Sequence, residues 1–190
     1  MAKPSHTPMV RSPVAHDSAV KHVTGSAVYV DDILEPAGLL HAYVGVSRVA
    51  SGKVRSMDLS KVRAAKDVIA VITADDVPGQ NDTSPMHTMD EPILASKEVK
   101  FCGQVLFAVA ATDRNAARWA ARLVEFEIDE SESIIEIEDA VERESWVTEP
   151  HEMSRGDVAE GLARSACRLQ GEVETGGQDH FYLEGQASMA

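Results

Sequence analysis

Residues 105–129 read VLFAVAATDRNAARWAARLVEFEID and contain the pattern that decides the fold. Residues 105–111 are apolar on both faces, which is typical of a strand in the middle of a sheet. Thr112 or Asp113 can cap the helix that follows. Residues 124–129 then alternate apolar and acidic side chains, as a strand with one exposed face does. The stretch predicts a strand-helix-strand unit.

Within the predicted helix, apolar side chains and arginines recur at helical spacing on opposite sides. The apolar stripe, which we expect to pack in the core, consists of Ala116, Trp119, Ala120 and Leu123. The basic residues on the other side are Arg114, Arg118 and Arg122. We interpret these arginines as a solvated face, with an anion-binding site as the alternative.

An earlier segment has the same order of elements. Residues 54–59 predict a strand, Ser60 is a suitable N-cap for a helix through Lys66, and residues 68–72 are apolar on both faces. We therefore expect residues 68–72 to form a central strand, covered on both sides. Residues 39–47 predict another strand, whose buried face is expected to carry Leu40, Ala42, Val44 and Val46. The predicted class is α+β, built from two strand-helix-strand units.

The remaining composition divides the chain into further segments. Residues 1–24, with three prolines and no periodicity, predict an extended arm before a domain at residues 25–130. Residues 78–92 are rich in Gly, Asn, Asp and Pro and predict a long surface loop. Residues 131–153 are acidic and predict a linker with one helical turn, anchored by Trp146.

Residues 154–190 are predicted to begin a second domain. Asp157 is expected to cap a short helix to about Ser165, and Cys167, Leu169 and Val173 fit one face of a following strand. Cys102 and Cys167 have no partner at metal-binding or redox spacing, so we expect reduced, partly buried thiols.

Charge and composition exclude several classes of function. The net charge of −13 would repel a phosphate backbone, so no nucleic-acid partner is expected. No run of 18 apolar residues and no secretory h-region occur, which predicts a cytoplasmic protein without a membrane span. Phosphate-binding, nucleophile-elbow and zinc-protease motifs are absent, and the seven histidines are scattered. No catalytic residue is assigned.

Residues 176–186 read GGQDHFYLEGQ and form the one unusual polar segment. A double glycine lets the backbone turn sharply or approach a ligand closely. Residue composition alone favours a tight turn whose polar groups satisfy one another, and a ligand-binding segment is the alternative.

The first nine residues of this segment, 176–184 (GGQDHFYLE), resemble a motif that is specific to the molybdenum hydroxylases of the xanthine dehydrogenase and aldehyde oxidase type. Asp179 stands where that family commonly has Glu, and Val105 follows Gly103-Gln104 where Pro is common. The resemblance extends over nearly the whole chain from about residue 15. It rests further on residues 16–19 (HDSA), 23–25 (VTG), 27–32 (AVYVDD), 68–78 (VIAVITADDVP) and 103–104 (GQ).

The resemblance implies an α/β hammerhead domain at residues 25–130 and the start of the first molybdenum-cofactor domain from residue 154. It implies that Gln178, beside Gly177, binds the cofactor by a hydrogen bond to an oxygen ligand of molybdenum, without ligating the metal directly. An amide suits this role because it donates a hydrogen bond and adds no charge. The glutamate base and substrate-orienting arginine of the family lie outside these 190 residues, and no role is assigned to His180 or Glu184.

For the complete protein, the resemblance implies hydroxylation of hypoxanthine and xanthine to urate with oxygen from water. Electrons would pass through the iron-sulfur clusters and FAD of a partner subunit to NAD. The expected partners are that subunit, the rest of the molybdopterin-binding subunit and a purine substrate. The 190 residues alone are expected to hold no cofactor and to be inactive. An aldehyde oxidase and a stand-alone hammerhead interaction module are the alternatives.

Overall fold

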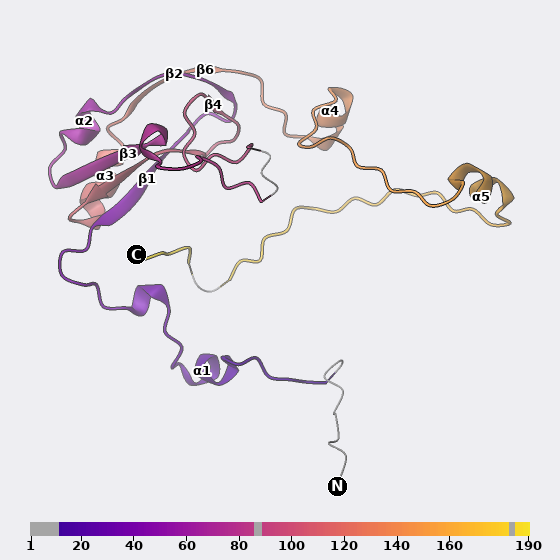
Figure 1. Ribbon diagram of the computed structural model, residues 1–190, viewed down its shortest axis with the longest axis horizontal. Helices are drawn as coiled ribbons and strands as arrows, with labels where there is room; N and C mark the ends of the chain where they lie inside the picture. Colours follow the sequence, from indigo (N-terminus) through magenta and orange to yellow (C-terminus); the bar gives the residue numbers. More distant parts are fainter. Residues whose placement is uncertain (1–11, 86–88, 183–184) are drawn as a thin grey trace, which may run out of the picture. The chain divides into compact units, whose positions relative to one another are not determined.

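The computed structural model describes residues 12–85, 89–182 and 185–190 (Figure 1). The chain divides into two units, Ala37–Arg168 and the residues before and after it, and each unit is described by itself. The strands of Ala37–Arg168 form two three-stranded antiparallel sheets. The class is α+β, as the sequence predicts.

Strands that follow one another in the chain alternate between the two sheets. The first sheet has the order β1-β5-β3, and its strands are β1 (His41–Val46), β5 (Val105–Ala111) and β3 (Val68–Thr73). The second sheet has the order β4-β2-β6, and its strands are β4 (Glu98–Val99), β2 (Gly52–Asp58) and β6 (Glu125–Glu130). Helix α2 (Ser60–Arg63) joins β2 to β3, and α3 (Arg114–Ala121) joins β5 to β6. Each strand-helix-strand unit therefore crosses from one sheet to the other.

The central strand of the first sheet is β5, which pairs with β1 on one side and β3 on the other. Its prediction as a buried central strand is confirmed. The same prediction for residues 68–72 is wrong, because β3 is an edge strand on which Ile69 is 59% and Ile72 42% exposed. An apolar run indicates only that both faces of a strand are apolar. It does not indicate the position of the strand in the sheet, because that position depends on pairing partners far away in the sequence.

The core lies between the two sheets, where Phe107 of β5 meets Phe126 of β6 at a ring-centroid distance of 6.2 Å. Phe107 lies opposite Gly45 in the β1–β5 register and is fully buried. A Cβ at Gly45 would lie 2.0 Å from Cε1 of this ring. The absence of a side chain at Gly45 therefore makes the space that the ring of Phe107 occupies.

At residues 44–47 the burial pattern is the reverse of the predicted one. Gly45 and Ser47 are buried, whereas Val44 and Val46 are 44% and 38% exposed. The ring of Phe107 covers the glycine position, so the face with the small side chains packs inward. The valines, which the sequence assigned to the core, remain uncovered by the described residues.

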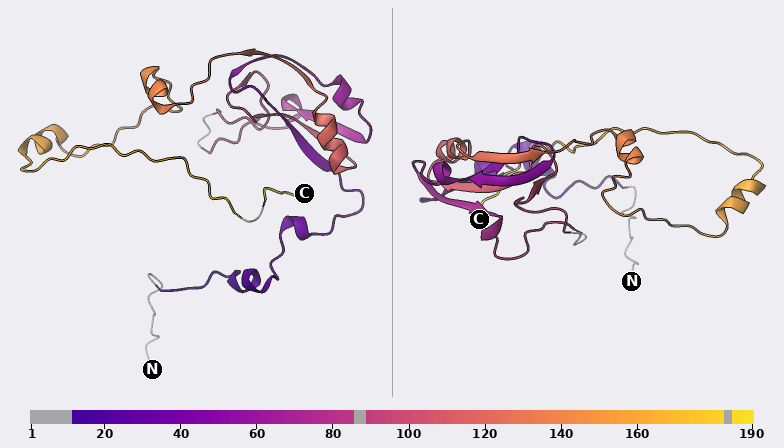
Figure 2. Two further views of the ribbon diagram at one scale, coloured as in Figure 1. Left: turned by 180° about the vertical axis from the view of Figure 1, so that it is seen from behind. Right: turned by 90° about the horizontal axis from the view of Figure 1, so that it is seen from above.

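Of the two predicted caps for helix α3, Asp113 is the one observed: its carboxylate accepts hydrogen bonds from the backbone N–H groups of Asn115 (2.9 Å) and Ala116 (3.0 Å). The predicted apolar stripe is wrong in part, because Trp119 is 61% and Leu123 43% exposed. The buried side chains of the helix are Ala117, Ala120 and Ala121. Helix α3 packs against β1 and β5 (Figure 2). Because its buried residues are alanines, the helix can approach the sheet closely.

The first turn of α2 is held by Asp58 and not by the predicted cap Ser60. Ser60 is the first helical residue, and its backbone N–H donates to Oδ1 of Asp58 at 2.8 Å. The pKa of the Asp58 carboxyl lies below its ordinary value, mainly because of this hydrogen bond. The helix ends at Arg63, before the predicted end at Lys66.

Residues 78–92 form a loop over their described part, as predicted. The loop follows a 3-10 turn, η2 (Ala74–Asp76). Asn81 closes it through two hydrogen bonds to the backbone of Leu94, donating from Nδ2 to the carbonyl (2.7 Å) and accepting from the N–H (3.0 Å).

The segment after β6 contains two short helices, α4 (Ile137–Glu142) and α5 (Val158–Arg164). Asp157 caps α5 by accepting the N–H of Glu160 at 2.8 Å, as predicted. Trp146 is 54% exposed, so the predicted anchoring role is not observed.

The unit formed by the two ends of the chain contains helix α1 (Ala19–Thr24) and a 3-10 turn, η1 (Val30–Asp32). The described part of the predicted arm is therefore helical near its end, and residues 1–11 lie outside the described residues. Gly25 ends α1 in the left-handed conformation (φ 72°), which a glycine adopts without strain.

Two further predictions for the last part of the chain are wrong. Residues 167–173 form no strand, because the described residues include no partner strand for them. Cys102 and Cys167 are free thiols as predicted, but both are exposed.

We predict that Gly45→Ala lowers the free energy of unfolding by about 1–3 kcal/mol, because the new methyl group overlaps the ring of Phe107. Gly79→Ala is the matched control, since a Cβ there has no heavy atom within 4 Å. Urea unfolding followed by circular dichroism measures both. Equal stability of the two variants would contradict the proposed close packing of Phe107 on Gly45.

Candidate functional site

The polar segment that begins at Gly176 has an open backbone in the structure. Described residues 166–182 contain no helix or strand, and their side chains are exposed. A Cβ built at Gly176 or Gly177 meets no heavy atom within 4 Å. The two glycines therefore do not relieve crowding within the described chain, and their backbone is accessible to a bound group.

Gln178 is exposed, and its side-chain amide has no hydrogen-bonding partner among the described residues. The residues after it form a local turn, in which the N–H of Phe181 donates to Oδ1 of Asp179 at 3.2 Å. Phe181 has a φ of 44°, and the rings of His180 and Tyr182 lie 6.1 Å apart. The hydrogen bond and the ring contact of this turn do not involve the amide of Gln178. Glu184 lies outside the described residues.

The donor set of the segment suits a cofactor that brings the ligands of its own metal. No group of three or more His, Cys, Asp or Glu side chains that could hold a metal ion occurs among the described residues. A neutral amide and an accessible backbone can instead donate hydrogen bonds to an anionic cofactor without adding charge. The residues present therefore fit the group that the sequence resemblance implies, and Gln178 and Gly177 remain predicted contacts.

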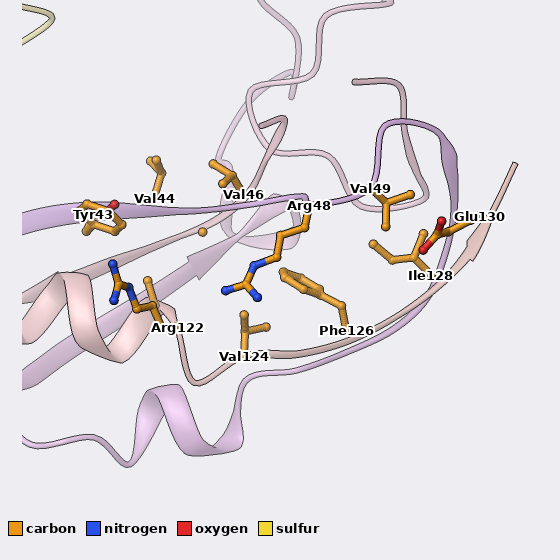
Figure 3. A pocket seen from close by; sticks show the side chains of 12 residues that line it. Tyr43, Val44, Val46, Arg48, Val49, Arg122, Val124, Phe126, Ile128 and Glu130 are labelled. Carbon is orange, nitrogen blue, oxygen red and sulfur yellow. The ribbon is translucent and has the colours of Figure 1, made fainter. Parts of the chain in front are cut away.

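A second feature, which the sequence analysis missed, is a groove beside β1 with a volume of about 530 Å³ (Figure 3). It lies between β1 and β6, and the guanidinium groups of Arg48 and Arg122 lie between the side chains of the two strands. Arg122 also stacks on the ring of Trp119, with Cζ 4.6 Å from the ring centroid. The signal in the sequence is the alternation that includes Val44 and Val46, which predicts that both valines lie in the core.

None of the helices in the described part of the chain is long and apolar enough to cross a membrane.

The part of the sequence that contains the two sheets matches a family model. Residues 24–132 match the model described as "Aldehyde oxidase and xanthine dehydrogenase, a/b hammerhead domain". This match covers more than half of the chain. The chain therefore belongs to the aldehyde oxidase and xanthine dehydrogenase family of molybdenum hydroxylases, a family of oxidoreductase enzymes.

Relatives of both named activities resemble the chain to a similar degree. Xanthine dehydrogenase/oxidase of Gallus gallus is 34% identical over 181 residues, which cover 95% of this chain and 13% of the relative. Aldehyde oxidase 3 of Mus musculus is 36% identical over 186 residues, which cover 97% of this chain and 14% of the relative. The chain thus spans a small part of the length of these relatives.

Solved structures of the family have the same fold. The aldehyde oxidoreductase of Desulfovibrio gigas is 29% identical with a TM-score of 0.60, over 65% of this chain and 15% of that one. Quinoline 2-oxidoreductase of Pseudomonas putida 86 is 25% identical with a TM-score of 0.62, over 81% of this chain and 21% of that one.

We predict that amide hydrogens of residues 169–180 exchange at nearly the rate of an unfolded chain, with protection below ~10-fold, whereas those of residues 105–111 are strongly protected. The reason is that β5 is hydrogen-bonded on both edges and residues 169–180 belong to no sheet. Hydrogen exchange followed by mass spectrometry at two protein concentrations measures this. Equal, concentration-independent protection of both segments would contradict the open backbone described above.

Proposed function

We propose that these 190 residues are part of the molybdopterin-binding subunit of a xanthine dehydrogenase, with a hammerhead domain at residues 25–130, a linker at residues 131–153 and the start of a cofactor domain at residues 154–190. The observation that supports the subunit and its domain order, for either named activity, is the extent of the alignments. The alignment with the Gallus gallus enzyme includes 181 of the 190 residues, so it must contain residues 176–181. Similarity to this enzyme therefore continues from the folded sheets into the open polar segment.

The proposed contact to the cofactor is the side-chain amide of Gln178. Its N–H groups have no partner among the described residues, and the glycine before it leaves the backbone accessible. We assign to Gln178 a hydrogen bond to an oxygen ligand of molybdenum, and to Gly177 a close approach of the backbone to the cofactor. When bound, the molybdenum cofactor supplies the two-electron oxidation that hydroxylation requires.

The proposed reaction of the complete enzyme is hydroxylation of hypoxanthine and xanthine to urate, with oxygen from water. Iron-sulfur clusters and FAD of a partner subunit would supply the electron transfer to NAD. In this assignment the chain works in the cytoplasm, together with the rest of its subunit and the partner subunit. The second candidate is an aldehyde oxidase, because Aldehyde oxidase 3 of Mus musculus matches over as much of the chain, at 36% identity.

The substrate assignment predicts that the complete enzyme has a kcat/KM at least ~100-fold higher for xanthine than for benzaldehyde. A pocket that hydrogen-bonds the purine leaves its polar groups unpaired when an aldehyde binds. Steady-state kinetics with NAD as the final acceptor measure the ratio. A ratio in favour of benzaldehyde would reject the xanthine assignment and support the aldehyde oxidase.

We predict that Gln178→Ala in the complete enzyme lowers turnover per bound molybdenum by between ~10-fold and ~10³-fold, the range for loss of a preorganised hydrogen-bond donor. Gln178→Glu should be at least as harmful near neutral pH, because an ionised carboxylate cannot donate and repels an electron-rich oxygen. Its turnover should recover in part as pH falls, since the protonated acid donates again.

The readouts for these variants are turnover, molybdenum content and folded yield, each as a function of pH. Gln186→Ala is the matched control, because Gln186 is an exposed glutamine of the same part of the chain. If Gln178 only supports the local turn, both Gln178 variants lose folded yield and molybdenum content while each remaining site turns over normally. That result would remove Gln178 from the reaction.

A further inference from the structure

The groove beside β1 is formed by an edge of β1 and a face of β6. From β1, the consecutive residues 43–46 line it, whereas β6 contributes the alternate residues Phe126, Ile128 and Glu130, and Val124 lines it from the position just before the strand. Side chains of a strand alternate between faces, so alternate residues mark one face of β6 and consecutive residues mark an edge of β1. The other edge of β1 pairs with β5. The groove therefore has a free strand edge as its wall and an apolar sheet face as its floor.

The described residues leave this free edge uncovered. Tyr43 and Val44 are 40% and 44% exposed, and Val46 is 38% exposed. An exposed edge strand with apolar side chains is a template for pairing with another extended segment. Residues 43–46 offer about four residues of edge, roughly 13 Å at a rise of 3.3 Å per residue.

The charges in the groove indicate the chemistry of its occupant. Arg48 and Arg122 both line it, and neither forms an ion pair with a carboxylate of a described residue. Glu130 is the acidic residue of the lining, at the last position of β6. In a chain with a net charge of −13, a groove with two guanidinium groups and one carboxylate is complementary to an acidic ligand.

We propose that this groove binds an extended acidic and apolar segment of a partner polypeptide, which adds a strand to the free edge of β1. In this arrangement the apolar side chains of the segment pack between Val44 and Phe126, and its carboxylates bind Arg48 and Arg122. Main-chain hydrogen bonds to β1 give affinity, and the two arginines select acidic sequences. The proposal involves neither Gln178 nor the cofactor, so it is independent of the proposed function.

The test uses the ¹⁵N-labelled 190-residue chain and a capped peptide, Ser-Ile-Glu-Val-Glu-Ile-Ser. Titration should shift the backbone amide resonances of residues 43–46 and slow the exchange of amides on the free edge of β1. A matched peptide with both Glu replaced by Gln should bind at least ~10-fold more weakly, and raised salt should weaken the acidic peptide alone.

Two variants test the arginines directly. Arg48→Glu and Arg122→Gln should each weaken binding of the acidic peptide by at least ~10-fold, with unchanged circular dichroism. Arg118→Glu is the control, since this exposed arginine of α3 does not line the groove. The proposal fails if up to ~1 mM peptide shifts no β1 resonance, or if the acidic and Gln peptides bind equally.

Sedimentation of the unliganded chain tests whether a second copy occupies the groove instead. We expect a monomer up to the concentration of the titration. A concentration-dependent dimer that Arg48→Glu dissociates would identify a second copy as the occupant and overturn the assignment to a partner polypeptide.

Discussion

The two sheets are joined by the ring of Phe107, which lies across Gly45 and against Phe126. Phe107 belongs to the central strand of one sheet, and Phe126 to an edge strand of the other. The contact fixes the distance between the sheets, and helix α3 can then pack against β1 and β5 through three alanines. A larger residue at position 45 would move the ring, and with it both the sheet spacing and the groove between β1 and β6.

The sequence predicts where strands and helix caps occur better than it predicts which strands pair with each other. The central position of β5 and the caps at Asp113 and Asp157 were predictable, because they depend on local apolarity or on a carboxylate close to free N–H groups. The edge position of β3 was not, since it depends on which distant strand pairs with β5. On β1, Gly45 faces inward because the ring of Phe107 occupies the space beside it. Hydrophobicity alone would instead turn Val44 and Val46 inward.

The two candidate sites differ in how they could be found. Nothing in the composition of residues 176–186 distinguishes a cofactor contact from a turn, so Gln178 was singled out only by a resemblance to a family. The structure adds that its amide has no described partner. The groove, in contrast, could be found only from the structure. Arg48 and Arg122 are 74 positions apart by their numbers, and only the fold places them on one groove.

The alternation of successive strands between the sheets has a consequence for synthesis on the ribosome. In the described structure, strands β1, β2 and β3 do not pair with one another. Each of them pairs only with β4, β5 or β6, which come later in the chain. Until Glu98 has been made, the growing chain therefore cannot form a single native strand pair. Its apolar segments, including residues 68–72, have no native strand partner over that time, and exposed apolar surface of this kind favours aggregation of an unfinished chain.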